Sequence, residues 1–339
     1  MAFTLVTGGC GFIGNNFIRQ IRREEPERHI LNLDLLTYAG NLENLADLEG
    51  DEGYRFVKGD IADQAFVEGL FEEHEIRAVV HFAAESHVDR SILGPGVFVR
   101  TNVAGTQVLL EAARRHWKGG ERFLMVSTDE VYGSLGPEGL FREDTPLDPS
   151  SPYSASKAAS DLLCQAWHRT YGLPILISRC SNNYGPYQFP EKLIPLMIQR
   201  ASRGEDLPVY GDGMNVRDWI HVDDHNRALR LILERGAPGR VYNIGADNEQ
   251  ANLRIVERIL DRLEKPRDLL RFVTDRPGHD RRYAMDSSRL QGELGWRSLV
   301  NFDEGLAATI DWYLENRSWW ERILSGEYRE YYSRQYGEG

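Results

Sequence analysis

A glycine-rich segment near the start of the chain constrains the fold more than any other feature. An apolar run at residues 3–7 leads into TGGCGFIG at 7–14, which has glycines at positions 8, 11 and 14 and is followed by a helical pattern. Side chains in such a turn would block a pyrophosphate, and a Cβ at the third glycine would hold the helix off the sheet. The N–H groups at the start of the helix would then face the phosphates. The segment therefore predicts a strand–turn–helix unit that binds a dinucleotide.

An acidic residue stands at the spacing that such a unit requires. Asp34 ends the second apolar run, 20 positions after Gly14, where an acid binds the ribose 2′-hydroxyl. Leu35, Leu36 and Thr37 follow, and no neighbouring arginine is present to accept a 2′-phosphate. The pattern favours NAD over NADP. A simple cap at the end of a strand is the alternative role for Asp34.

Short apolar runs alternate with amphipathic segments over the first half of the chain. This alternation predicts βαβ units, and hence an α/β fold with a doubly wound parallel sheet and helices on both faces. We expect strands at 3–7, 30–33, 55–57, 78–82, 123–127 and 175–178, and helices at 12–23, 63–73, 99–117 and 154–171. After about residue 180 the chain becomes rich in Asn, Gly, Tyr and Pro. We therefore expect residues 1–180, with a returning segment near 216–246, to bind the dinucleotide, and residues 181–339 to form mainly a smaller substrate-binding lobe.

Composition excludes several other classes of protein. Hydrophobic residues make up 41% of the 339 and charged residues 27%, with a net charge of -12 and no basic run, so we expect no nucleic-acid partner. The three cysteines show no CxxC spacing, which argues against disulfides and structural zinc and favours a cytoplasmic location. No run of about 18 apolar residues is present, so we expect no membrane span.

Two patterns suggest catalytic chemistry. Tyr153 and Lys157 form a YxxxK motif, whose ends share one face of a helix; a nearby cation favours a phenolate and should lower the pKa of Tyr153. Thr128, Asp129 and Glu130 follow the strand at 123–127, at the sheet edge where α/β proteins bind ligands. Two carboxyls there suit acid/base catalysis if their pKa values differ. Taken alone, each pattern is equally compatible with exposed surface residues.

These motifs give the chain a family resemblance along nearly its whole length. It resembles the extended short-chain dehydrogenases/reductases, and most closely the dTDP-glucose 4,6-dehydratases among them. The resemblance rests on TGGCGFIG (7–14), DLLTYAGN (34–41), HFAAESHVDRSI (81–92), STDEVYG (127–133), YSASK (153–157), RCSNNYGPYQFPEKLIPL (179–196), GDGMNVRDWIHVDDH (211–225) and RPGHDRRYAMD (276–286). The acid pair is its most specific element, because epimerase relatives tend to lack it.

The resemblance implies a Rossmann-type fold and an NAD-dependent conversion of dTDP-glucose to dTDP-4-keto-6-deoxyglucose. Tyr153, supported by Lys157 and Thr128, would take the proton of the C4 hydroxyl, Glu130 the C5 proton, and Asp129 would protonate the leaving C6 hydroxyl. The cofactor-binding set is then Gly8, Gly11, Phe12, Ile13, Gly14, Asp34, Asp60, Ile61, Ala83, Ala84, Tyr153 and Lys157. The substrate-binding set is Ser86, His87, Thr128, Asn182, Lys192, Leu193, Arg217, Asn252 and Arg276. A homodimer through the helices at 99–117 and 154–171 is also implied.

Other functions remain open on these residues. The same chemistry on a UDP- or GDP-linked sugar, a UDP-sugar 4-epimerase, and a silent NAD-sensing scaffold all share the cofactor motifs. The segment HVDDH at 221–225 carries histidines four residues apart, a spacing seen in metal sites. It is equally compatible with a strand end followed by a helix cap, and we expect no metal.

Overall fold

All seven strands of the central sheet run parallel. The structure, a computed structural model, describes residues 1–325 and orders the sheet β10-β6-β5-β4-β1-β2-β3. The strands are β1 (Ala2–Thr7), β2 (His29–Asp34), β3 (Tyr54–Lys58), β4 (Glu75–His81), β5 (Arg122–Thr128), β6 (Ile175–Cys180) and β10 (Val241–Ile244). The first six overlap the predicted runs and begin or end within a few residues of them; β4 ends at His81, one residue before its predicted end. The seventh joins the sheet after a long excursion of the chain.

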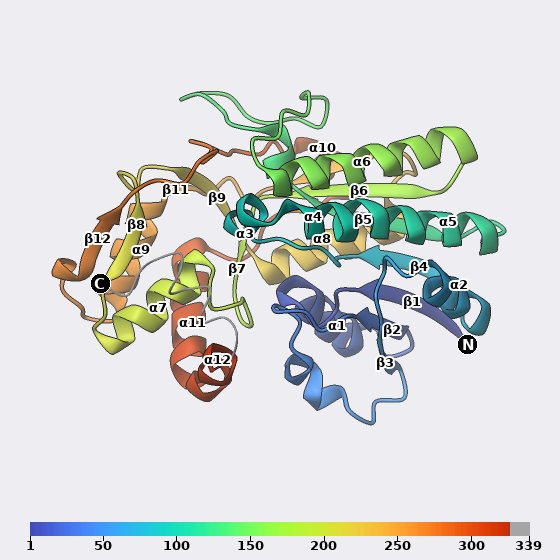
Figure 1. Ribbon diagram of the computed structural model, residues 1–339, viewed down its shortest axis with the longest axis horizontal. Helices are drawn as coiled ribbons and strands as arrows, with labels where there is room; N and C mark the ends of the chain where they lie inside the picture. Colours follow the sequence, from blue (N-terminus) through green and yellow to red (C-terminus); the bar gives the residue numbers. More distant parts are fainter. Residues whose placement is uncertain (326–339) are drawn as a thin grey trace.

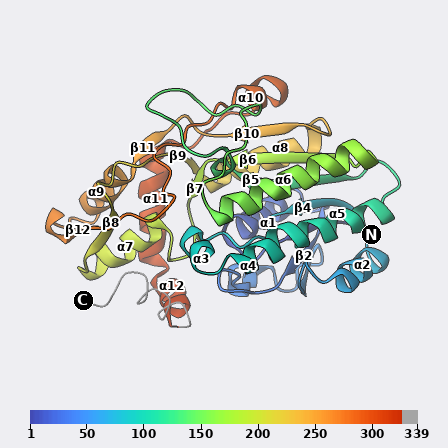
Figure 2. The ribbon, with the colours of Figure 1, turned by 45° about the horizontal axis from the view of Figure 1, so that its top comes forward.

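Helices cover both faces of this sheet (Figures 1 and 2). The long ones are α1 (Phe12–Glu24), α2 (Gln64–Glu73), α5 (Thr106–His116), α6 (Pro152–Tyr171) and α8 (Val222–Arg235). Alternate residues of β1 point to opposite faces: Leu5 packs in one apolar core with α2 and α5, and Val6 in another with α1 and α8. Both faces of the sheet are buried under helices, which explains why the strand sequences are continuous apolar runs. The predicted fold class is confirmed.

The helix expected at 99–117 differs in its start and its regularity. The helical segment begins at Pro95 with α4 (Pro95–Phe98). It continues as a π-helix, η2 (Val99–Gly105), and then as α5. Proline suits this first position because its fixed φ matches the helix and its missing N–H would have no partner there. A further short helix, α3 (Val88–Leu93), precedes it.

A smaller lobe is built from the second half of the chain. It contains the sheet β11-β9-β7 and the pair β12-β8, and Figures 1 and 2 place it beside the carboxyl ends of the large sheet. Its elements are β7 (Asn182–Tyr184), β8 (Leu207–Tyr210), β9 (Val216–His221), β11 (Glu249–Ala251), β12 (Leu270–Val273), α7 (Leu193–Arg203), α9 (Asn252–Arg262), α11 (Phe302–Glu315) and α12 (Arg317–Leu324), while α10 (Ser288–Leu294) packs beside β10. Three short 3₁₀ turns, η1 (Leu42–Leu48), η3 (Asp129–Tyr132) and η4 (Arg267–Leu269), complete the described chain. Within residues 1–325, no helix has the length and apolar character that a membrane span requires.

Candidate active site

A cavity of about 310 Å³ opens at the carboxyl ends of the parallel strands, the edge at which α/β sheets bind ligands. It brings together every residue expected to bind the cofactor and every residue expected to be catalytic. Its lining includes Gly8, Gly11, Phe12, Ile13, Gly14, Asp34, Asp60, Ile61, Ala83, Ala84, Thr128, Asp129, Glu130, Tyr153 and Lys157. Residues as far apart in sequence as Gly8 and Tyr153 thus face one space.

The glycine loop fits a pyrophosphate. Gly8 has a φ of 72°, and a Cβ there would lie 2.6 Å from the backbone nitrogen of Ala83; a Cβ on Gly14 would collide with the carbonyl of Gly8. Only glycine allows the loop, β4 and α1 to approach this closely. No side chain caps the start of α1, where Gly11 is the N-cap. Its first N–H groups are therefore available to the phosphates of a dinucleotide.

Asp34 is held in place at the end of β2 by two backbone donors. The N–H groups of Cys10 and Leu36 donate to its carboxylate at 2.9 and 2.8 Å. Burial raises the pKa of Asp34, and these two hydrogen bonds oppose that rise. Lys157 and Lys192 are the only cationic side chains that line the cavity within residues 1–325. The lining therefore contains no arginine beside Asp34 that could bind a 2′-phosphate. The site fits NAD better than NADP.

The acid pair begins a 3₁₀ turn, η3, directly after β5. The N–H of Glu130 donates to the Thr128 hydroxyl at 3.3 Å, and that hydroxyl donates to the Asp129 carboxylate at 3.1 Å. Burial, reinforced by the charge of Glu130, raises the pKa of Asp129 well above its usual value. Burial also raises the pKa of Glu130, but the cations Arg276, Lys192 and Arg217 oppose it. The two neighbouring carboxyls thus lie in different electrostatic environments, which is the arrangement that paired acid/base catalysis needs.

Tyr153 and Lys157 lie in the first half of α6. Ser151 and Ser154 form a reciprocal cap that starts this helix, and the Lys157 ammonium donates to the carbonyl of Val126 at 2.9 Å. Burial raises the pKa of Tyr153 well above its usual value, the charges of Glu130 and Asp129 add to this, and the Thr128 hydroxyl opposes it. The expectation that the nearby cation Lys157 lowers the pKa of Tyr153 is wrong, because burial and the charges of Glu130, Cys180 and Asp129 raise that pKa.

The expected substrate residues are only partly gathered. Ser86, Asn182 and Lys192 line the cavity together with Thr128, whereas His87, Leu193, Arg217, Asn252 and Arg276 do not. His87 caps α3 by accepting from the N–H of Arg90, Leu193 and Asn252 begin α7 and α9, and each arginine is engaged: Arg276 pairs with Asp89 at 3.0 Å, and Arg217 donates to the carbonyl of Asp280 at 2.9 Å. Both arginines still lower the pKa of Glu130, so their charge reaches the site.

Several lining residues were not predicted. Most of them lie in segments that the sequence already singled out. Their part in the cavity could not be predicted, because the residues that face them come from distant parts of the chain. They are Leu35, Thr37, Tyr38, Ala39, Gly40, Gly59, Glu85, Thr101, Ser127, Asn183, Gln188, Phe189 and Glu191.

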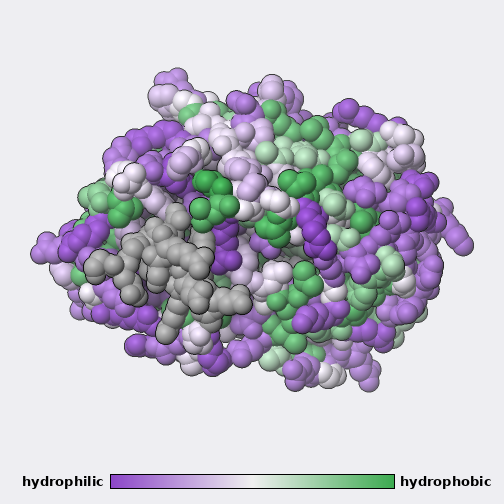
Figure 3. Space-filling view, in the orientation of Figure 1, coloured by the Kyte–Doolittle hydropathy of each residue, from purple (hydrophilic) through white to green (hydrophobic). Residues whose placement is uncertain are grey.

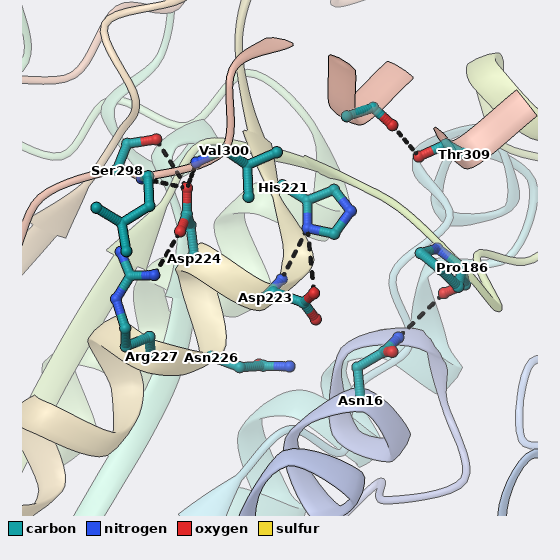
Figure 4. A network of polar contacts seen from close by, with 12 residues as sticks. Asn16, Pro186, His221, Asp223, Asp224, Asn226, Arg227, Ser298, Val300 and Thr309 are labelled. Carbon is teal, nitrogen blue, oxygen red and sulfur yellow. Dashed lines mark hydrogen bonds and ion pairs between the residues drawn. The ribbon is translucent and has the colours of Figure 1, made fainter. Parts of the chain in front are cut away.

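The HVDDH segment joins β9 to α8 (Figure 4). His221 ends the strand and itself caps the helix by accepting from the N–H of Asp223 at 3.3 Å. Asp224 accepts from the Ser298 hydroxyl and from the N–H of Val300, at 2.8 and 2.9 Å, and pairs with Arg227. His225 is buried against the Asn183 side chain. Residues 1–325 contain no cluster of three His, Cys, Asp or Glu side chains able to hold a metal.

Comparisons with known proteins agree along almost the whole chain. The family described as GDP-mannose 4,6 dehydratase matches residues 5–309. A dTDP-glucose 4,6-dehydratase of Xanthomonas campestris pv. campestris is 55% identical, covering 97% of this chain and 98% of the relative. The crystal structure of DesIV, a dTDP-glucose 4,6-dehydratase from Streptomyces venezuelae with NAD and TYD bound, is 51% identical, with a TM-score of 0.91, and the match covers 95% of this chain and 100% of DesIV.

More distant relatives share the fold with less of the sequence. A UDP-glucose 4-epimerase from Thermotoga maritima superposes with a TM-score of 0.86 at 29% identity, over 94% of this chain and all of the epimerase chain. The dehydratases therefore match this chain better than the epimerase does. The chain belongs to the dTDP-glucose 4,6-dehydratase family of extended short-chain dehydrogenases/reductases.

Proposed function

We propose that this protein is an NAD-dependent lyase that converts dTDP-glucose into dTDP-4-keto-6-deoxyglucose and water. The observation that carries the proposal is the pair Asp129 and Glu130, two carboxyls whose pKa values are raised by burial, in one cavity with Tyr153 and Lys157. The dTDP-glucose 4,6-dehydratases at 50% identity and above support the nucleotide.

Tyr153 and Lys157 serve the oxidation at C4. When bound, NAD supplies a cationic nicotinamide ring that accepts the hydride from C4 and later returns it at C6. Tyr153 takes the proton of the C4 hydroxyl, and the cationic charges of Lys157 and the ring stabilise its phenolate in this buried site. Thr128, whose hydroxyl lowers the pKa of Tyr153, orients the phenol.

The acid pair then removes water. The C4 ketone makes the C5 proton acidic, so Glu130, the carboxyl with the smaller rise in pKa, takes it as the base. Asp129, protonated, donates its proton to the departing C6 hydroxyl, which leaves as water. The hydride returns to C6, and Glu130, whose proton exchanges with water, protonates C5. The proton gained by Tyr153 leaves through solvent as Asp129 takes one up, so one hexose loses one water with no net oxidation.

The nucleotide sugar is held from the lobe side. Lys192, Arg217 and Arg276 face the two phosphate charges, and arginine's fork suits phosphate oxygens. Ser86, His87, Leu193, Asn182 and Asn252 complete the sugar and nucleoside contacts. Residues 1–180 with the return near 216–246 form the NAD-binding domain, and residues 181–339 mainly the substrate lobe. The places of β10 in the large sheet and of α8 against it support this division, whereas β9, at the start of the return, pairs within the lobe. Residues 326–339 of that lobe lie outside the described part of the chain.

Incubation with nucleotide sugars tests the activity. dTDP-glucose should yield a 4-keto product, detected by its absorbance in alkali, with kcat/KM about 10–200-fold above that for UDP-glucose, since one methyl group separates the two bases. A UDP-sugar 4-epimerase would produce no such chromophore, and a scaffold would convert nothing. Preference for a UDP- or GDP-sugar would retain the chemistry and reject the nucleotide.

The pH dependence of kcat/KM should be bell-shaped. Glu130 must be ionised, so activity falls as pH drops through its raised pKa; Asp129 must be protonated, so activity falls again as pH rises through its higher pKa. The acid limb should lie above the ordinary carboxyl value of about 4.3. Initial rates of keto-product formation across pH measure both limbs. Activity that stays constant down to that value contradicts the assignment.

We further infer a cytoplasmic homodimer. Exposed apolar side chains gather on α3, α4, η2 and α6, namely Ile92, Leu93, Val97, Val99 and Leu162, and Figure 3 shows hydrophobic surface over this region. A second copy of the chain would bury this face through the two predicted helices. Three unpaired, buried cysteines support a reducing compartment.

A further inference from the structure

Three segments from different parts of the chain meet at the cavity. The loop after β2 contributes Tyr38, the start of α3 contributes Arg90, and the connection between β7 and α7 contributes Phe189 and Glu191. Tyr38, Phe189 and Glu191 line the cavity beside the cofactor residues. We call Tyr38, Arg90, Phe189 and Glu191 the clasp. The first two come from the NAD-binding half and the last two from the start of the lobe.

The clasp residues contact one another, and two of them, Phe189 and Glu191, are buried. The Arg90 guanidinium lies 3.8 Å from the centre of the Tyr38 ring, and Phe189 meets that ring edge-on with centroids 5.4 Å apart. Glu191, which is 6% exposed, places a carboxylate oxygen 3.6 Å from Arg90. Burial raises the pKa of Glu191 to about 7, while Lys192, Arg90 and the Tyr38 hydroxyl oppose the rise. Arg90 thus contacts both the Tyr38 ring and the Glu191 carboxylate, and these contacts join the two parts of the chain beside the cavity.

Hydrogen bonds hold the connection between β7 and α7, which carries Phe189 and Glu191, in place. The Asn16 amide of α1 donates to the carbonyl of Pro186 at 3.0 Å (Figure 4), and the Tyr313 hydroxyl donates to the carbonyl of Gln188 at 2.5 Å. Lys192 donates to the carbonyl of Ser86 at 3.2 Å. These hydrogen bonds hold the connection at several points, so the Phe189 and Glu191 side chains are positioned against Tyr38 and Arg90 beside the cavity.

The proposed reaction requires the cofactor to stay bound between two hydride transfers. The hydride removed from C4 returns to C6 of the same sugar, so a cofactor that leaves between the two transfers strands an unreduced hexose. We propose that the clasp retains the cofactor in its channel through the cycle, with Tyr38, Arg90, Phe189 and Glu191 as positioning residues. This inference rests on the proposed function.

Cofactor dissociation tests the clasp without any sugar. Protein loaded with NADH is mixed with excess NAD, and the loss of bound NADH fluorescence gives the dissociation rate. Tyr38→Ala removes the ring that both Arg90 and Phe189 contact, and should raise the rate about tenfold, since a partly buried cation–ring contact and an aromatic pair are lost together. NAD should also co-purify at a lower occupancy. Tyr38→Phe keeps the ring and should dissociate within about threefold of the wild-type rate.

Matched variants separate a clasp from a general loss of structure. Phe272, 58% exposed on β12, provides Phe272→Ala as an aromatic-to-alanine control that should leave the rate unchanged. Phe189→Leu, which keeps most of the buried volume, should raise it by a smaller factor and serves if Tyr38→Ala does not fold. Equal rates for wild type, Tyr38→Ala and Phe189→Leu would overturn the clasp. Failure of the wild type to form a 4-keto product would instead overturn the proposed function, whatever the dissociation rates.

Discussion

Glu130→Gln should reduce formation of the 4-keto-6-deoxy product by at least about 10²-fold, because general-base catalysis contributes about 10²–10⁴-fold. Gln is nearly isosteric with Glu and lacks only the charge, so the turn that begins at Thr128 should keep its hydrogen bond from the residue 130 N–H. Thermal unfolding and NAD content should match those of the wild type. The loss should therefore appear in chemistry alone.

Exchange of the C5 hydrogen identifies the step that is lost. In deuterated water the wild type should place deuterium at C5 of the product, whereas Glu130→Gln should leave C5 unexchanged in the recovered sugar. Asp129→Asn is the matched control: it removes the acid but keeps the base, so exchange at C5 should continue while water is not expelled. Exchange at the wild-type rate in Glu130→Gln would assign the base to another group.

Arg179→Met should lower the free energy of unfolding by about 3–5 kcal/mol, the cost of leaving one buried charge without its partner. The Arg179 and Asp161 side chains are 2% and 0% exposed and pair at 2.8 Å. Arg179 also donates to the Tyr132 hydroxyl at 2.8 Å, and that hydroxyl donates to the side chain of Asn243 at 2.7 Å. Urea unfolding of the variant and the wild type measures the difference.

A double variant distinguishes a lost partner from a lost volume. Asp161→Leu combined with Arg179→Met removes both charges, and most of the stability should return, because apolar replacement of a whole buried pair is often neutral. A double variant no more stable than Arg179→Met would show that packing, not the stranded carboxylate, carries the cost. The pair also lies close to the candidate catalytic residues. Asp161 lies one helical turn after Lys157, and Tyr132, to which Arg179 donates, belongs to the turn that holds Asp129 and Glu130.

The parts of the site that follow from local rules could be predicted from sequence. The glycine spacing, Asp34 at a strand end and the acid pair after β5 are fixed by one strand and the turn that follows it, so their positions at the sheet edge come from short-range geometry. The regular strands were predictable for the same reason. The π-helical segment η2 (Val99–Gly105) was not predictable, because its backbone irregularity has no marker in the residue pattern.

Long-range features escaped prediction. Tyr38 and Phe189 are about 150 positions apart in the printed sequence, and neither has chemistry that suggests a partner; only the path of the chain makes them neighbours. The same limit applies to Arg217 and Arg276, whose charge reaches Glu130 while their side chains bind Asp280 and Asp89. The sequence shows that both residues are cationic, but only the fold determines which groups lie close to them.

The return of β10 to the large sheet has a consequence for any attempt to divide this protein. A fragment ending at residue 180 would stop at β6 and lack both β10 and α8. Its last strand, β6, would expose unpaired backbone groups, and the apolar face of the sheet that α8 covers would be exposed. Both changes promote aggregation. Genetic dissection of the two halves therefore requires a rearranged or split polypeptide that supplies residues 222–244 alongside the first 180.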